Sequence, residues 1–149
     1  MKHAKDEYAR KDISYFLERF NTKGLSKLEI MAIQTVIKQL WQEVGEHWLP
    51  QSCHNIPPET DLANRILQES MYEDLFGQIK AKTYLHGHYF WALELKKGKT
   101  VILDPTGVPV GKTLCENIIP YFGLISEAKG FHKTVYENMK DDDGWRFHP

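Results

Sequence analysis

The segment from His88 to Leu103 constrains the fold most strongly. Its two runs HYFWALEL and TVIL are rich in aromatic and β-branched residues, and KKGK between them has the composition of a tight turn. This pattern predicts an antiparallel β-hairpin. A three-residue loop at 96–98 with its glycine in the left-handed conformation pairs Leu95 with Lys99. A two-residue loop would shift the pairing of the two strands and place Asp104 opposite Trp91.

The three-residue loop sorts the hairpin into two faces, because side chains alternate along each strand. Phe90 then faces Asp104, and both share one face with His88. The opposite face is the expected core side and carries Trp91, Leu93, Val101 and Leu103. Asp104 becomes a diagonal neighbour of His88, close enough for a carboxylate to orient an imidazole and stabilise its charged form.

Helical patterns precede the hairpin. Apolar residues at spacings near three and four predict a first helix from about Lys5 to Phe20. A second helix starts at Ser26, which forms a capping box with Glu29, and is expected to end around Trp48. A shorter helix follows a proline-rich loop and covers about 60–70. The second helix is expected to be the longest element and to lie at the centre of the core.

A strand from about Gln78 is expected before the hairpin, and Pro105 is expected to end the last of these strands. Beyond it we expect a short helix from Lys112 to Ile119, broken by Pro120, and a helix or strand from Phe131 to Met139. Helices first and strands afterwards indicate the α+β class, with N-terminal helices packed on a small antiparallel β-sheet. The length of 149 residues fits a single domain (1–149).

Charge and hydropathy exclude several classes of partner. The formal net charge of -1 provides no basic field for a phosphate backbone, so we expect no binding to nucleic acid. Apolar runs such as YFWALEL are far shorter than the roughly 20 residues of a membrane helix, and MKHAKDEYARKD lacks the apolar centre of a signal peptide. We therefore expect no membrane association and a cytoplasmic location.

The two cysteines, Cys53 and Cys115, are too few for a disulfide framework. Cys53 lies in the loop before a predicted helix, where helix-end amides and a nearby imidazolium favour the thiolate. Cys115 lies inside an expected helix and is interpreted as a small buried residue. Cys53, His88 and Asp104 are therefore the candidate nucleophile, base and orienting group of a catalytic triad.

The order of these three residues resembles the papain-like and transglutaminase-like cysteine enzymes. Those families present a cysteine near a helix start, a histidine that opens a strand, and an Asp or Asn one strand later. The sixteen-residue step from His88 to Asp104 is similar to their common spacing, and Asp104-Pro105-Thr106 is similar to the Asp-Pro-Thr of the transglutaminase-like proteins. The resemblance covers Cys53 to Gly107. It departs from the usual transglutaminase Gly-x-Cys-Trp, since this chain has Gln-Ser-Cys-His at 51–54.

The resemblance implies a papain-like or transglutaminase-like fold and a thiol-dependent acyl-transfer enzyme. Cys53 would attack the acyl carbon of a protein or peptide amide, His88 would transfer the proton, and Asp104 would orient the imidazole. No cofactor is implied. Hydrolysis, deamidation and transfer to an amine stay open.

Two alternatives compete with this interpretation. The first is a non-catalytic binding or accessory module on the same scaffold. The second is a zinc-binding protein, because His86 and His88 alternate onto one strand face and Cys53, His54 or Asp104 would complete three or four ligands.

Overall fold

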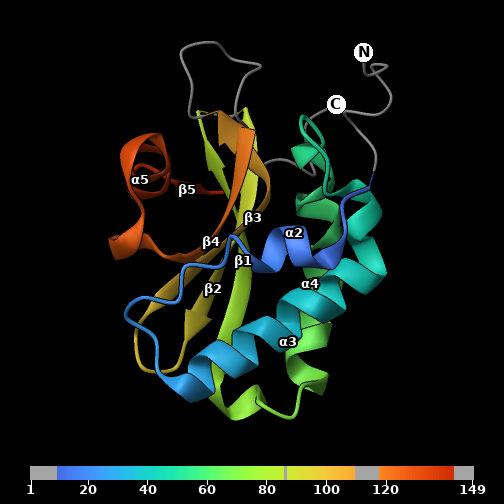
Figure 1. The fold of residues 1–149 in the computed structure, drawn as a ribbon, viewed down its shortest axis with the longest axis vertical. Helices are drawn as coiled ribbons and strands as arrows, with labels where there is room; N and C mark the ends of the chain where they lie inside the picture. The colour runs from blue at the N-terminus through green and yellow to red at the C-terminus, as the bar shows by residue number, and fades with distance from the viewer. Residues whose placement is uncertain (1–9, 86, 110–117, 143–149) are drawn as a thin grey trace.

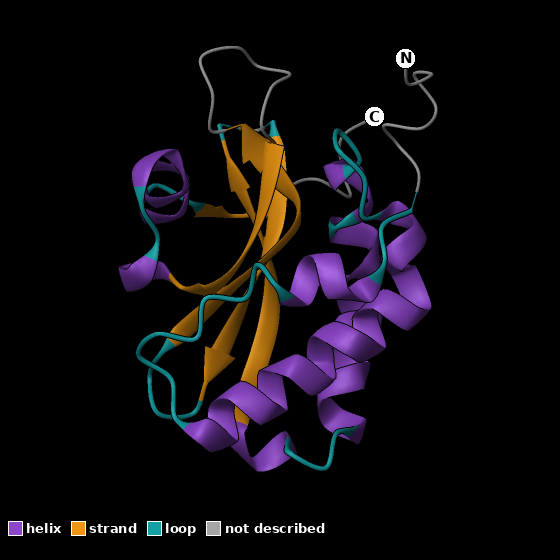
Figure 2. Cartoon of the chain, viewed as in Figure 1, coloured by secondary structure: helices purple, strands orange, loops and turns teal. Residues whose placement is uncertain are grey.

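The computed structural model describes residues 10–85, 87–109 and 118–142. An antiparallel sheet of five strands in the order β4-β3-β2-β1-β5 separates three helices from a fourth (Figures 1 and 2). The strands are β1 (Phe76–Tyr84), β2 (His88–Leu95), β3 (Thr100–Pro109), β4 (Ile118–Leu124) and β5 (Lys140–Asp141). The helices are α2 (Ile13–Leu17), α3 (Lys27–Val44), α4 (Thr60–Glu69) and α5 (Gly130–Glu137). The α+β class and the packing of N-terminal helices on an antiparallel sheet are confirmed.

The long helix α3 begins at the predicted capping box. The Ser26 hydroxyl accepts a hydrogen bond from the Glu29 amide at 3.1 Å, and the Glu29 carboxylate accepts one from the Ser26 amide at 2.8 Å. These two bonds satisfy amides that the first turn leaves free. A 3₁₀ helix at Gly45–His47 follows α3, which agrees with the predicted end near Trp48.

The hairpin between β2 and β3 has the predicted register. The amide of Leu95 donates to the carbonyl of Lys99 at 2.8 Å, and Gly98 has a φ of 89°. Trp91 pairs with Leu103 as the last pair of the β2–β3 ladder. The three-residue loop is therefore confirmed, and its register carries His88 and Asp104 onto one face.

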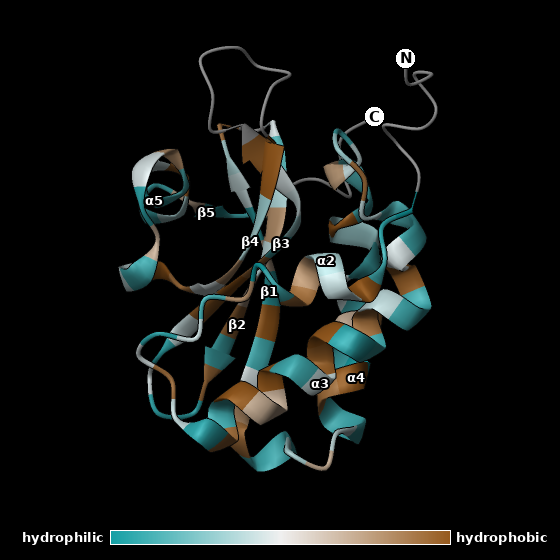
Figure 3. Ribbon diagram, in the orientation of Figure 1, coloured by the Kyte–Doolittle hydropathy of each residue, from teal (hydrophilic) through white to brown (hydrophobic). Residues whose placement is uncertain are grey.

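Each face of the sheet packs on its own core. The helix-side core is formed by α2, α3 and α4 against apolar side chains that include Trp91 and Leu93. Apolar and polar residues alternate around α3 and α4, as expected of helices that cover a sheet (Figure 3). The α5-side core consists of Phe90, Ala92, Ile102, Val108, Tyr121, Ala128, Val135 and Tyr136. The sequence predicted the first of these cores and missed the second.

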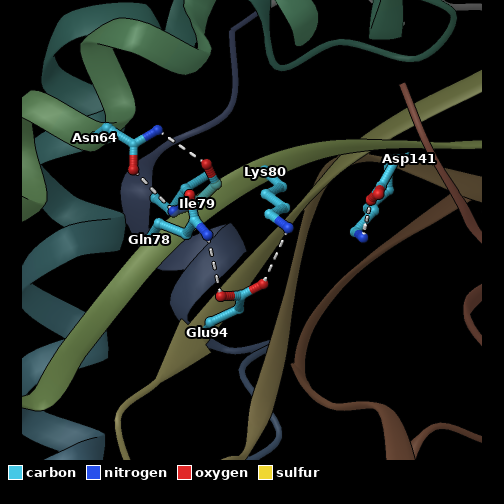
Figure 4. A network of polar contacts seen from close by, with 7 residues as sticks. Asn64, Gln78, Ile79, Lys80, Glu94 and Asp141 are labelled. Carbon is cyan, nitrogen blue, oxygen red and sulfur yellow. Dashed lines mark hydrogen bonds and ion pairs between the residues drawn. The ribbon is translucent and has the colours of Figure 1, made fainter. Parts of the chain in front are cut away.

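A polar side chain fastens α4 to the sheet. The Asn64 amide group donates to the carbonyl of Ile79 at 2.8 Å and accepts from its backbone amide at 2.8 Å (Figure 4). Glu94 on β2 binds Gln78 and Lys80 of β1 beside it. The two Asn64 hydrogen bonds satisfy backbone groups of β1 at the place where its pairing with β2 is irregular.

The first helix is shorter than predicted. α2 covers only Ile13–Leu17, with Asp12 as its N-cap, and residues 5–9 of the predicted helix lie outside the described residues. Phe20 forms a bridge with Phe122, and the amide of Asn21 donates to the carbonyl of Phe122 at 2.7 Å. The chain leaves the helix because its backbone pairs with β4 there.

Two expectations based on proline were wrong. β3 does not end at Pro105 but continues to Pro109, and its pairing with β4 is irregular between Asp104 and Val108. Ile118–Leu124 is a strand that runs through Pro120, whereas 112–117 of the helix predicted there lie outside the described residues. A residue without an N–H group is tolerated at irregular pairing and in an edge strand such as β4.

The C-terminal part of the described chain returns to the sheet. The segment predicted as helix or strand from Phe131 to Met139 is helical in α5, and β5 then pairs with β1. Lys82 and Asp141 form an ion pair across this edge. None of the helices in 10–85, 87–109 and 118–142 combines the length and the apolar character needed to cross a membrane.

Candidate functional site

The structure brings His88 and Asp104 into direct contact. Nε2 of His88 lies 2.8 Å from Oδ2 of Asp104. His88 is the first residue of β2, and Asp104 lies on β3 beyond the last pair of the regular ladder. The Asp104 side chain is fully buried, and that of His88 is 16% exposed. This contact is the one that the hairpin register predicted.

The Asp104 carboxylate receives three hydrogen bonds. Besides His88, the Tyr136 hydroxyl donates to Oδ2 at 2.7 Å, and the Gly107 amide donates to Oδ1 at 3.2 Å. Gly107 has a φ of 78°, and a β-carbon there would lie 2.7 Å from the backbone of Ile119. A glycine is therefore required to aim this amide at the carboxylate. A buried carboxylate that lacked such donors would favour its neutral form.

The surroundings of His88 favour the charged form of its imidazole. Burial opposes the charged imidazole, but the charge of Asp104 and its hydrogen bond, together with a hydrogen bond and the charge of Cys53, raise the pKa of His88 to about 10. Since Asp104 binds Nε2, Nδ1 is the ring nitrogen that is left for the interaction with Cys53. The imidazole therefore lies between a carboxylate and a thiol.

Cys53 lies next to the start of β2. It opens a three-residue 3₁₀ helix that packs on β2, and its sulfur approaches the carbonyl oxygen of Gly87 at 3.7 Å. The thiol is free and partly exposed. A second 3₁₀ helix, Pro57–Glu59, separates it from α4, so Cys53 lies outside the first turn of α4. Its partner in the site is the imidazolium of His88, and the α4 terminus expected to assist it begins seven residues later.

Three consecutive aromatic residues follow His88 in β2 and have different surroundings. The His88 ring stacks on Phe90 at 5.5 Å, and Phe90 is fully buried in the α5-side core. Trp91 is also fully buried, in the helix-side core. Burial, the charge of Asp142 and the charge of Cys53 raise the pKa of Tyr89. Of the three neighbouring aromatics, Tyr89 is the partly exposed one and lies within electrostatic range of the thiol.

Sequence reasoning missed Tyr136. This residue is in α5, 32 positions after Asp104, and its ring is almost completely buried. The helical pattern of its segment gave no information on which face of the sheet α5 covers. A lone tyrosine within an apolar pattern is an ordinary core residue, so no sequence signal separated it from Phe90 or Val135.

The competing metal site receives no support from the described residues. Across 10–85, 87–109 and 118–142, no three or more His, Cys, Asp or Glu side chains are grouped so that they could hold a metal ion. His86, one of the suggested ligands, lies outside the described residues, and so does Cys115.

Comparisons of the chain with family models, curated proteins and solved structures found no match.

Proposed function

We propose that this protein is a thiol-dependent acyl-transfer enzyme in which Cys53 is the nucleophile, His88 the acid and base, and Asp104 the group that orients the imidazole. The papain-like or transglutaminase-like scaffold is part of this proposal. The observation that carries it is the convergence of Cys53 and Asp104 on the imidazole of His88. The His88–Asp104 contact of 2.8 Å and the interaction of Cys53 with the same ring support it.

The proposed reaction begins with the sulfur of Cys53 as a thiolate. Its electron pair forms a bond to the acyl carbon of an amide, and the C–N bond breaks as the amine leaves with the proton of the His88 imidazolium. The neutral imidazole then takes a proton from water or an amine, which attacks the thioester. The C–S bond breaks, and the thiolate and the imidazolium are restored.

The environment of His88 suits this cycle. A positive charge beside the sulfur stabilises the thiolate, and a leaving amine requires a proton donor when the C–N bond breaks. Asp104 supports the imidazolium from the other side of the ring. The identity of the final acceptor decides between hydrolysis, deamidation and transfer, and protein or peptide amides are the proposed substrate class.

The test is selective alkylation with iodoacetamide at pH 7, followed at each cysteine by peptide mass spectrometry. We expect Cys53 to react about tenfold faster or more than Cys115, because a thiol of ordinary pKa is only a few per cent thiolate at this pH. His88→Ala should abolish the preference, and Asp104→Asn should weaken it. Slow labelling of both cysteines would favour the non-catalytic binding module.

A second readout reports acyl transfer itself. p-Nitrophenyl acetate should release a burst of p-nitrophenol and leave one acetyl group on Cys53, detected by the intact mass. Cys53→Ser is the matched control, since it keeps the side-chain size and should lose both signals. A burst of equal size in Cys53→Ser would contradict the assignment of the nucleophile.

A further inference from the structure

Tyr136 lies on α5 and contacts the site from behind Asp104. Its hydroxyl donates to Oδ2 of Asp104 at 2.7 Å, the same oxygen that His88 binds at 2.8 Å. The ring is 1% exposed. Burial, followed by the charge of Asp104, raises the pKa of Tyr136 well above its ordinary value, so the phenol keeps its proton and acts as a donor.

The neighbours of Tyr136 hold its ring in place. Tyr121 of β4 stacks on it at 5.4 Å, His132 of α5 stacks at 5.9 Å, and Phe90 of β2 meets it edge-on at 5.1 Å. His132 binds the carbonyl of Ile119 at 2.9 Å. Burial raises the pKa of Tyr121 to about 12, so that phenol is neutral as well. Asp104 and the His88 beyond it are the charged pair that faces the Tyr136 hydroxyl.

We propose that Tyr136 is a positioning residue of the site, whose hydroxyl binds the Asp104 carboxylate and keeps it aimed at His88. This inference rests on the proposed function, since it assigns Tyr136 a task in the proton transfers of His88. The hydroxyl matters most when the imidazole is neutral, because the buried carboxylate then has no cation beside it. Tyr136 therefore makes it easier for His88 to give its proton to a leaving group.

The substitution Tyr136→Phe removes the donor and retains the ring. Without the hydroxyl, the carboxylate next to a neutral imidazole is less stable, and His88 should hold its proton more tightly. We expect the titration midpoint of His88, followed by NMR of the imidazole, to rise by about one pH unit.

Tyr121→Phe is the matched control. Tyr121 stacks on Tyr136 and belongs to the same core, but its hydroxyl donates to the carbonyl of Leu124 at 2.7 Å. This variant should leave the His88 midpoint unchanged even where it lowers the melting temperature. An unchanged or lowered midpoint in Tyr136→Phe would overturn the role of Tyr136, because a purely structural phenol has no effect on the imidazole.

The kinetics of Cys53 separate this inference from the proposed function. In Tyr136→Phe, alkylation of Cys53 at pH 7 should stay within about twofold of the wild type, because the imidazolium is retained, while acylation by an amide substrate should slow about tenfold. A raised midpoint with an unreactive Cys53 in the wild type would overturn the proposed enzyme and leave the role of Tyr136 intact. A reactive Cys53 together with an unchanged His88 midpoint in Tyr136→Phe would support the proposed enzyme and overturn the role of Tyr136.

Discussion

The two faces of the sheet bury different kinds of side chain. Twenty-two buried residues form the helix-side core and eight form the α5-side core among the residues that the structure describes. The smaller core nevertheless surrounds Asp104, which has no exposed surface, together with its donor Tyr136. Leu103 and Asp104 are adjacent in β3, yet one faces each side.

The helix-side core therefore contributes mainly to stability, and the α5 side also holds the groups of the proposed site. The helix-side core is large, apolar and gives the sheet its support, so a change of volume there should affect folding and leave the site unchanged. On the α5 side, a buried charge is tolerated because Tyr136, Gly107 and His88 all donate to it. Substitutions of the groups that contact Asp104 on that side should affect folding and reactivity together.

Among substitutions on the α5 side, Asp104→Ala should cause the largest loss of stability and reactivity. It leaves the Tyr136 hydroxyl, the Gly107 amide and His88 without their partner, and we expect the free energy of unfolding to fall by about 3–5 kcal/mol. With the carboxylate gone, burial would lower the pKa of His88, and the preferential alkylation of Cys53 should disappear. Urea unfolding and peptide mapping measure the two effects.

Asp104→Asn is the control for that experiment. The amide has nearly the same shape, and its single oxygen can still accept from either Tyr136 or Gly107, so the loss of stability should be smaller than for Asp104→Ala. The loss of charge should still reduce the labelling of Cys53. A stability loss in Asp104→Ala below about 1 kcal/mol would show that the carboxylate is not the centre of a buried network.

Leu93→Ala is the corresponding change on the helix side. Leu93 is fully buried between the sheet and the helices, and its truncation should cost about 2–5 kcal/mol in the free energy of unfolding. Measured well below the melting temperature, the alkylation rate of Cys53 should equal that of the wild type. A reduced rate would contradict the separation of the two faces.

The structure also shows which features the sequence could predict. The turn at 96–98 fixed the hairpin register, because one glycine with a positive φ determines which residues pair, and the contact of His88 with Asp104 followed from it. Ser26 and Glu29 placed the start of α3 through local hydrogen bonds. These signals act within a few residues or within one strand pair.

Other features depend on contacts between distant segments. Pro105 and Pro120 were read as ends of elements, but irregular pairing and an edge position accommodate both in strands. The contact of Tyr136 with Asp104 depends on the side of the sheet to which α5 returns, and its residues alone do not determine that. The Cys53 assignment depended on the predicted order of residues, and its interaction with His88 required the tertiary structure.

The stability of the protein should depend on pH through His88. The pKa of His88 is raised from 6.5 to about 10, so the stability it contributes is fully present below pH 6.5 and is lost as pH rises through about 10. In a Cys53→Ser background, which removes the part of the His88 shift that Cys53 contributes, the free energy of unfolding should still fall by up to about 1.4 kcal/mol per pH unit, over a window that ends at a lower pH. The double variant Cys53→Ser with His88→Gln should lack this slope. An equal slope in the single and the double variant would show that groups other than His88 cause it.

The smallest expected effect lies on the helix side, at the capping box. Burial alone would raise the pKa of Glu29, but hydrogen bonds from Ser26 and the hydrogen bond and charge of Lys99 lower it below its usual value. Ser26→Ala removes the acceptor for the Glu29 amide and should cost about 1 kcal/mol at pH 7, measured by urea unfolding. Ser26→Thr keeps the hydroxyl and should cost less.

The Glu29 carboxylate also makes the stability at this end of α3 depend on pH. Because the folded pKa of Glu29 is lowered, the stability that its charge provides is present above pH 4.5 and is lost as pH falls through the folded value. Lys99, 3.0 Å from Glu29, ties α3 to the strand that follows the hairpin turn. Lys99→Met should therefore destabilise the protein at neutral pH and have little effect at pH 3. A constant cost at both pH values would mean that packing of the lysine stem, and not its charge, joins α3 to the hairpin.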